Sequence, residues 1–364
     1  MKKVMVIIPA LGSGGGERLA VSLISKMNPT IIQSKLVVLY PYKDTENARL
    51  TVEHEIDTVY LNKHRGVDLS IVRKLKKEID EFKPDVIQTH LYVVAYVLLA
   101  APLKIKKYHT VHNVAEKEAF GWRRIINRIA FKFGNFVPVA ISPYCAKTIE
   151  NLYGIRSENI PCIMNGVDTS EYTVSPIRHN GMVFINVGRL QTQKNQALLI
   201  KAFARVVKKE PEAKLIIVGE GELRKELEVL IAQYGIERCV SMPGQCNDVR
   251  ERLNAADVFV QSSDYEGLPI AGLEAMACGL PLISTKAGGT VDIIKNNENG
   301  FLVDIGDSDG LAQKMIFLIE NKEIREKMGA ESRKIVEMYN LDKCAQKYQQ
   351  LYMENRLLEN LEES

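Results

Sequence analysis

Cysteine is scarce and scattered in this 364-residue sequence, and its spacing excludes two kinds of scaffold. The six cysteines form no C-x-x-C pair and have no partner histidines at metal-ligand spacing. This argues against a disulfide framework and against structural zinc. Sparse, unpaired cysteines are typical of a reducing cytosol, so we expect a cytoplasmic protein.

Long hydrophobic runs are also missing. The opening residues, MKKVMVIIPALG, resemble a signal peptide only superficially, because the short apolar run leads into GSGGGER and not into a small-residue cleavage site. The longest other apolar run, residues 91–103, has thirteen residues, fewer than the roughly 20 that a spanning helix needs. We expect a buried first strand and no transmembrane segment.

Neither sign of charge dominates the sequence, but basic and acidic residues are unevenly distributed along it. The net charge is +3; residues 1–170 carry 24 Lys and Arg against 16 Asp and Glu, and the remainder carries 24 against 29. Much of the basic excess lies in residues 73–77, 103–107 and 122–132, the last with basic and apolar residues at helical spacing. Two interpretations stay open: solvated helix faces, or a cationic surface that binds anionic lipid. The sequence has no nucleic-acid recognition motif, so we expect no nucleic-acid partner.

What the sequence does contain is an alternation of strands and helices. With 46% hydrophobic residues, the chain is long enough for two domains of roughly 150 to 200 residues each. Because parallel strands need crossover helices, the alternation predicts an α/β protein with two doubly wound parallel sheets. The predicted strands are 4–10, 35–40, 85–90, 108–112, 136–142 and 159–165 in the first half, and 182–188, 214–219, 257–263, 281–285 and 300–303 in the second.

The domain boundaries follow from the least patterned segment, residues 165–181, which is rich in Gly, Pro, Ser and Asn and is the expected linker. The predicted domains are 1–168 and 182–340, each Rossmann-like and facing one cleft, where such sheets bind ligands. For residues 341–364 two possibilities stay open: a final helix that returns to the first domain, or a frayed tail.

The segment SSDYEGLPIAGLEAMACGLPLIST, residues 262–285, places two carboxylates eight positions apart. Glu266 is expected in a loop after a buried strand, and Glu274 on the following helix, which Pro269 opens. A carboxylate near a helix start can accept both hydroxyls of a ribose, while the amides of Gly267 and Leu268 face an anion. Two carboxylates with different roles suit a nucleotide sugar.

Cations for such an anion are expected from another loop of the same domain. Arg189 and Lys194 flank a turn after the strand at 182–188 and can clamp a diphosphate. Gly288 and Gly289 follow another strand, and their amides can approach phosphate closely.

These motifs together resemble glycosyltransferase family 4, the large group of retaining GT-B enzymes. The resemblance rests on an E-x7-E motif from Glu266 to Glu274, on G-R-x4-K from 188 to 194, on N-G-V-D from 165 to 168, and on the glycine pair at 288–289. The match runs nearly the whole length of the chain in the expected order, so a GT-B architecture is expected.

The resemblance implies a retaining glycosyltransferase that moves a sugar from a nucleotide-sugar donor to an acceptor hydroxyl. The second domain would hold the donor, with Arg189 and Lys194 on the diphosphate, Glu274 on the ribose and Glu266 on the transferred sugar. The base would lie near residues 242–245, a predicted loop that contains Gly244.

The glycine-rich loop at residues 12–18, which includes Gly15 and Gly16, resembles the family's loop beside the donor phosphates and the acceptor. It is not a dinucleotide fingerprint, because Glu17 stands where G-x-G-x-x-G requires the last glycine. His112 matches the family's histidine near the transferred sugar, whereas His109 is predicted to pack inside a strand.

Two other motifs have simpler interpretations. Ser142, followed by Pro143, is expected to cap a helix and not to act as a nucleophile. The only D-x-D string, Asp307 to Asp309, directly precedes a predicted helix and is also expected to cap it. We therefore expect no metal and no cofactor, with the nucleotide sugar as a substrate.

The sequence identifies the acceptor least well. Residues 113–124 carry aromatic and basic side chains that suit a glycan and an anionic lipid surface. This suggests a cytoplasmic, peripheral enzyme at the inner face of the plasma membrane that transfers a sugar, most simply from a UDP-sugar, to a lipid-linked glycan in cell-surface polysaccharide synthesis. Two alternatives are a nucleotide-sugar epimerase of the same fold and a noncatalytic scaffold of a polysaccharide assembly complex.

Overall fold

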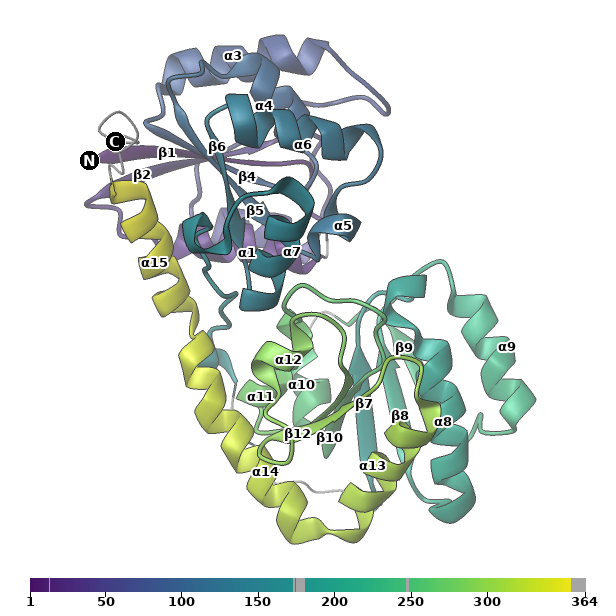
Figure 1. Ribbon diagram of the computed structural model, residues 1–364. Helices are drawn as coiled ribbons and strands as arrows, with labels where there is room; N and C mark the ends of the chain where they lie inside the picture. Colours follow the sequence, from purple (N-terminus) through teal and green to yellow (C-terminus); the bar gives the residue numbers. More distant parts are fainter. Residues whose placement is uncertain (13, 173, 175–180, 247–248, 355–364) are drawn as a thin grey trace. The chain divides into compact units, whose positions relative to one another are not determined.

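The computed structural model describes residues 1–12, 14–172, 174, 181–246 and 249–354. The chain divides into two compact units, which are treated separately below (Figure 1). Unit 1 comprises Met1–Asn165 together with the chain from Leu341 onward, and unit 2 comprises Gly166–Asn340.

Unit 1 is built on a parallel six-stranded sheet in the order β3-β2-β1-β4-β5-β6. The central strands are buried along most of their length, as expected where helices cover both faces, and β4 and β5 carry buried polar side chains as well as apolar ones. Helices α3, α4 and α6 lie on one face, and α1, α7 and α15 lie on the other (Figure 1). The strands are β1 (Lys2–Ile8), β2 (Ile32–Val38), β3 (Thr58–Tyr60), β4 (Val86–His90), β5 (Lys106–Val111) and β6 (Phe136–Ala140). The helices are α1 (Gly15–Ser25), α2 (Glu46–Glu53), α3 (Ser70–Phe82), α4 (Val94–Ala100), α5 (Ala115–Glu118), α6 (Trp122–Phe133), α7 (Pro143–Tyr153) and α15 (Leu341–Met353).

Unit 2 repeats the same topology, with the order β12-β11-β10-β7-β8-β9 and parallel pairing throughout. Helices α8, α9 and α13 cover one face, where Phe184 packs edge-to-face on Phe203 (Figure 1). The strands are β7 (Val183–Val187), β8 (Lys214–Val218), β9 (Val240–Gly244), β10 (Val258–Gln261), β11 (Leu282–Thr285) and β12 (Gly300–Val303). The helices are α8 (Gln196–Lys209), α9 (Arg224–Tyr234), α10 (Val249–Asn254), α11 (Ile270–Ala277), α12 (Thr290–Ile293), α13 (Ser308–Glu320) and α14 (Lys322–Ile335).

The prediction of two doubly wound parallel sheets is therefore confirmed, with differences in detail. Residues 159–165, predicted as a strand, form only an isolated bridge from Cys162 to Ala140, because Pro161 cannot donate to a ladder. Strand β3 was not predicted. Of the predicted linker, residues 173 and 175–180 lie outside the described residues, whereas Thr169–Glu171 form a short 3-10 helix.

The two predicted helix caps are confirmed. Ser142 accepts a hydrogen bond from the amide of Cys145 at 3.1 Å, with Pro143 in the first turn. Asp307 accepts one from the amide of Gly310 at 2.8 Å.

Helix α15 belongs to unit 1 and is held there by buried tyrosines. Tyr348 hydrogen-bonds to Thr110 on β5 at 3.0 Å, and Tyr352 donates to Gln88 on β4 at 3.1 Å. Both rings are almost fully buried, so the end of the described chain closes one face of the first sheet.

Candidate active site

The strand order identifies where each unit can bind a ligand. In each sheet the chain winds outward in both directions from a central pair, β1 with β4 in unit 1 and β7 with β10 in unit 2. Ligands of doubly wound sheets bind at this switch point, beyond the carboxyl ends of the two central strands. In unit 2 the loops there are residues 188–195 and 262–269, and they contain most of the predicted donor residues.

Glu266 is the centre of the unit 2 site. Its side chain is only 6% exposed, and its Oε1 atom accepts hydrogen bonds from Ser263 at 2.5 Å, Lys194 at 2.6 Å and Gln261 at 2.8 Å. Among the described residues only the amide of Gln193 approaches Oε2, at 3.4 Å. One oxygen is thus saturated by the protein, and the other retains capacity to accept from a ligand.

Lys194 ends the short 3-10 helix Thr192–Lys194 and reaches across the switch point to Glu266. Its side chain is 21% exposed. An ammonium group has three N–H donors, and Glu266 is its one ion-pair partner among the described residues. The remaining donors are available to an anion.

Asn195 makes this geometry possible. It adopts a left-handed backbone conformation, with φ 45°, and its side chain caps α8 by accepting from the amide of Leu198 at 3.2 Å. The same side chain donates to Asp264 at 2.8 Å, and Ser262 donates to the backbone oxygens of residues 194 and 195. The two loops are therefore joined before any ligand binds.

Gly288 and Gly289 lie directly against the Glu266 backbone. The amide of Gly289 donates to the carbonyl oxygen of Glu266 at 3.1 Å. Gly288 has φ +59°, and a Cβ atom there would lie 2.0 Å from that same oxygen. The predicted glycine pair therefore fixes the position of Glu266, whatever else its amides bind.

The turn after Glu266 leads into α11, as predicted, with one difference. Pro269 is the residue before the helix and not its first turn residue, and Gly267 and Leu268 are buried. Glu274 lies on α11 with 9% exposure, and its carboxylate accepts a hydrogen bond from Tyr172 at 3.1 Å. The two glutamates thus have separate environments, one in a loop and one on a helix.

Arg189 follows β7 and Gly244 ends β9, with β8 between these two strands. The Arg189 side chain is exposed, while its carbonyl oxygen accepts from Gln196 at 3.1 Å. Residues 242–244 were predicted as a loop but form the end of β9; Gly244 has φ +85°, and a Cβ there would contact Glu220. The prediction of a loop was wrong, because parallel pairing with β8 extends the strand through Gly244.

The predicted residues of unit 1 also come together. Gly15 begins α1, and a Cβ atom on Gly16 would lie 3.3 Å from Nδ1 of His112, which follows β5. Nε2 of His112 is 2.9 Å from Nδ1 of His90. Burial lowers the pKa of His112 to about 4, so this histidine is neutral near pH 7.

Sequence reasoning missed several side chains of these sites. Gln261, Ser263 and Tyr172 orient the two glutamates, yet single polar residues beside a strand or in a linker give no recognisable pattern. In unit 1 the missed residue is Glu118, half-buried at the end of α5, where burial raises the pKa of its carboxyl from 4.5 to about 7.

Glu118 predicts a pH-dependent effect on stability. The pKa of Glu118 is higher in the folded protein than in the unfolded chain. Its favourable contribution to the free energy of unfolding is therefore complete below pH 4.5 and is lost as the pH rises through about 7. We expect Glu118→Gln to be about 2 kcal/mol more stable than the wild type at about pH 8, and nearly equal at about pH 4.5. Urea unfolding at both pH values measures this. Glu116→Gln, an exposed neighbour, is the control; a difference that is the same at both pH values contradicts the assignment.

In the part of the chain that the structure describes, no three His, Cys, Asp or Glu side chains are grouped as metal ligands would be. Likewise, none of its helices combines the length and the apolar character that crossing a bilayer requires.

Comparison with known proteins gives a consistent result. The family model for "Glycosyltransferase Family 4" matches residues 13–171, and that for "Glycosyl transferases group 1" matches residues 169–335. EpsD of Bacillus subtilis (strain 168), named as a glycosyltransferase, is 31% identical over 293 residues, covering 73% of this chain and 76% of EpsD. The Escherichia coli UDP-Gal:alpha-D-GlcNAc-diphosphoundecaprenol alpha-1,3-galactosyltransferase is 27% identical, covering 79% and 78%.

A solved structure matches the whole fold. HepE from Anabaena, crystallised with UDP-glucose, has a TM-score of 0.85 and 23% identity, covering 96% of this chain and 99% of HepE. The fold and the paired switch-point loops define a GT-B glycosyltransferase. The chain belongs to glycosyltransferase family 4, as its motifs predicted.

Proposed function

We propose that this protein is a retaining glycosyltransferase that moves a sugar from a UDP-sugar to a hydroxyl of a lipid-linked glycan, in the synthesis of a cell-surface polysaccharide. The observation that carries the proposal is the ion pair of the buried Glu266 with the partly exposed Lys194 at the switch point of unit 2. Similar proteins support the choice of donor and acceptor, since the Escherichia coli relative is named for a diphosphoundecaprenol-linked sugar and HepE was crystallised with UDP-glucose.

The ion pair suits the bond that has to break. Transfer breaks the bond between the anomeric carbon and the diphosphate oxygen, and it forms a bond from that carbon to the acceptor oxygen. The acceptor's proton leaves with the diphosphate. Negative charge grows on the leaving diphosphate, which Lys194 and the exposed Arg189 stabilise. This assignment needs no metal or cofactor.

The carboxylates bind the neutral parts of the donor. Glu266 accepts from hydroxyls of the transferred sugar through Oε2, while Lys194 contacts the phosphate beside it. Glu274, oriented by Tyr172, accepts from the ribose hydroxyls. The amides of Gly267, Leu268 and Gly288 line the phosphate side, Gly289 holds the backbone of Glu266 beside them, and Gly244 lies against the base. These roles predict that one class of nucleotide binds selectively.

Nucleotide binding is the test of this function. We expect UDP, and not GDP, ADP or CMP, to raise the melting temperature, since a ligand at about 100 times its Kd adds roughly 2.7 kcal/mol. Glu274→Gln keeps an acceptor for Tyr172 but loses the charge, so UDP affinity is expected to fall about tenfold. Glu251→Gln, on the exposed surface of unit 2, is the control. If no nucleotide shifts the wild type, the noncatalytic scaffold becomes the better hypothesis.

Unit 1 is proposed to bind the acceptor. Gly16, in the first turn of α1 after Gly15, lies against His112, and a neutral His112 can hydrogen-bond to the reacting sugar without adding charge. We propose that the enzyme acts in the cytoplasm at the inner face of the plasma membrane, where a lipid-linked acceptor is accessible.

Helix α6 provides a surface for that membrane. Its outer face exposes Trp122, Ile125, Ile129 and Phe133, at 57%, 63%, 45% and 67%, with the spacing of one helical stripe. Arg128 and Lys132 lie beside the stripe and are exposed. An apolar stripe next to basic residues is the pattern of helices that lie in anionic bilayer surfaces.

Vesicle binding tests this surface. We expect the protein to sediment with phosphatidylglycerol vesicles at low salt, and Ile129→Glu to weaken binding about tenfold because it places a charge in the apolar stripe. Val229→Glu, at an exposed valine of α9 in unit 2, is the matched control. Equal binding of both variants, or no binding by the wild type, contradicts the membrane assignment.

A further inference from the structure

The three arginines of helix α6 have different surroundings. Arg124 donates to two backbone oxygens of the preceding segment, at 3.2 and 3.3 Å, and Arg128 donates to the backbone oxygen of Leu152 at 2.8 Å. Arg123 makes no hydrogen bond and no ion pair within the part of the chain that the structure describes. The fold therefore uses two of these guanidinium groups, while the N–H donors of the third have no acceptor among the described residues.

Aromatic rings hold Arg123 in place instead. Its guanidinium lies 5.0 Å from the ring centre of Tyr92, 5.6 Å from that of Trp122 and 5.9 Å from that of Phe120. The attraction between a cation and the face of a ring restrains the guanidinium but does not occupy its N–H donors, which lie in the guanidinium plane. A restrained, planar guanidinium with available donors is well suited to bind phosphate through two parallel hydrogen bonds.

The charged groups around Arg123 have other partners. Lys63, another cation near Tyr92, is 5% exposed, and its ammonium group donates to two backbone oxygens of the loop that follows it. Glu118 lines the same small space as Arg123, and its carboxyl group accepts hydrogen bonds from the backbone amides of residues 112 and 113. Arg123 is therefore the cation here whose donors can bind an external anion.

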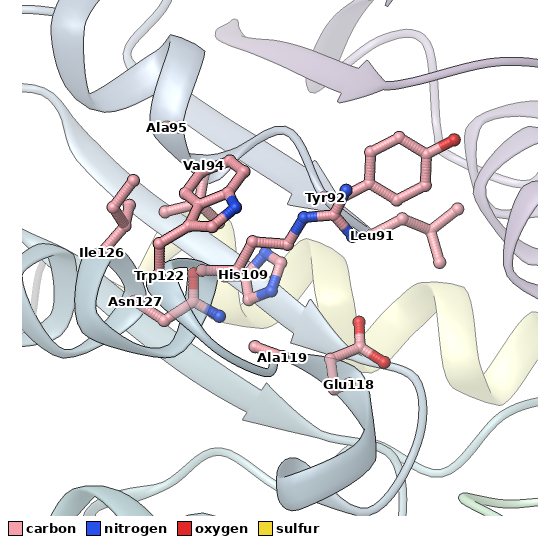
Figure 2. A pocket seen from close by; sticks show the side chains of 11 residues that line it. Leu91, Tyr92, Val94, Ala95, His109, Glu118, Ala119, Trp122, Ile126 and Asn127 are labelled. Atoms are coloured by element: carbon pink, nitrogen blue, oxygen red, sulfur yellow. The ribbon is translucent and has the colours of Figure 1, made fainter. Parts of the chain in front are cut away.

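Arg123 lies between two features of unit 1. Tyr92 is the second residue after β4, a central strand, and therefore lies at the switch point; Leu91, with φ 59°, turns the chain there. Trp122 begins α6 and the apolar stripe on its outer face. Figure 2 shows Tyr92 and Trp122 lining one small space, which Arg123 also lines. The cation thus lies where the proposed membrane surface meets the proposed acceptor site.

A lipid-linked glycan has to extend between the same two features. Its hydrocarbon chain stays in the bilayer on which the stripe lies, and its reacting hydroxyl has to reach the switch point. The phosphate groups that join the lipid to the glycan therefore lie in between. We infer that Arg123 binds the diphosphate of a lipid-linked acceptor, with its N–H groups donating to the phosphate oxygens. This inference rests on the proposed function.

The phosphate of an ordinary membrane phospholipid is the competing ligand. Arg128 and Lys132 flank the apolar stripe further along α6 and are exposed, so they suit the general negative charge of a bilayer surface. Arg123 differs from them because its aromatic neighbours connect it to the segment after β4. Its position at the switch-point end of α6 favours the acceptor diphosphate.

Two kinds of vesicle separate these ligands. One contains undecaprenyl diphosphate in phosphatidylcholine, and the other contains phosphatidylglycerol in phosphatidylcholine at the same zeta potential. We expect the wild type to bind the first about tenfold more tightly, because a bidentate contact adds to the general attraction. Arg123→Lys keeps the charge but loses the planar fork, so we expect it to lose this preference and to bind the phosphatidylglycerol vesicles as the wild type does.

Arg123→Gln and Arg128→Gln are the charge-matched pair, because each removes one cation from the same helix. Both are expected to weaken binding to the phosphatidylglycerol vesicles by about fivefold, whereas only Arg123→Gln is expected to lose the preference for the diphosphate. Equal affinity of the wild type for the two kinds of vesicle overturns the inference, as does a preference that persists in the Arg123 variants. If one Arg123 variant does not fold, the other decides.

A UDP melting experiment on the same preparations distinguishes this inference from the proposed function. A wild type that binds UDP but has no preference for the diphosphate overturns the role of Arg123 and leaves the proposed function standing. A preference that depends on Arg123, in a protein that no nucleotide stabilises, supports the diphosphate site and overturns the transferase function.

Discussion

Replacing Lys194 by Met is expected to lower kcat/KM for sugar transfer roughly 1,000-fold. The methionine keeps most of the volume but removes the cation beside the leaving diphosphate, and loss of one preorganised electrostatic contact of this kind costs about 100- to 1,000-fold. Initial rates of UDP release with donor and acceptor measure the effect. Lys201→Met, on the exposed side of α8, is the control and is expected to retain wild-type rates.

The same substitution is expected to destabilise the protein by about 3 kcal/mol, because it leaves the Glu266 charge buried without its partner. Glu266→Gln in the Lys194→Met background removes that charge, and Gln261 and Ser263 can still donate to the amide oxygen. The double variant is expected to recover most of the stability and none of the activity. If it recovers both, Lys194 acts only on folding, and its catalytic role is wrong.

Gly288→Ala is the second substitution with a large expected effect, at about 4 kcal/mol of stability and near-complete loss of transfer. Gly288 has φ +59°, and an added Cβ would lie 2.0 Å from the carbonyl oxygen of Glu266. The backbone that positions Glu266 must therefore move. A left-handed conformation alone costs an alanine about 1 to 2 kcal/mol; the collision adds to it.

Gly306→Ala separates the cost of the left-handed backbone conformation from the cost of the steric collision. Gly306 has φ +83°, and no atom lies within 4 Å of its added Cβ, so this variant has the conformational cost without the collision. We expect it to lose about 1 kcal/mol and to keep its activity. Urea unfolding and initial rates on both variants test this; equal stability losses would contradict the packing of Gly288 on Glu266.

The fold was largely predictable because its signal is periodic. Buried strands such as Val258–Gln261, followed by helices with one apolar face, predict crossover connections and hence parallel sheets. Strand β3 was missed because it has three residues, all half-buried at the sheet edge. Residues 159–165 gave a false strand because they are apolar, whereas ladder pairing is limited by Pro161.

The individual residues of the site were predictable from the sequence, but the contacts between them were not. The sequence places Lys194 and Glu266 after different strands, and their 2.6 Å contact exists because β7 lies beside β10. The two strands are adjacent because of the strand order in the sheet, and the pattern of residues along the sequence does not reveal that order. His109 was predicted to pack inside a strand, and it is buried.

A crystal structure with UDP shows whether the donor diphosphate binds at the switch point of unit 2. We predict that the β-phosphate lies within hydrogen-bond distance of Lys194 Nζ, between the loops 188–195 and 262–269, with the ribose hydroxyls on Glu274. UDP bound elsewhere, with the Lys194–Glu266 pair making no contact to it, would contradict the proposed donor site.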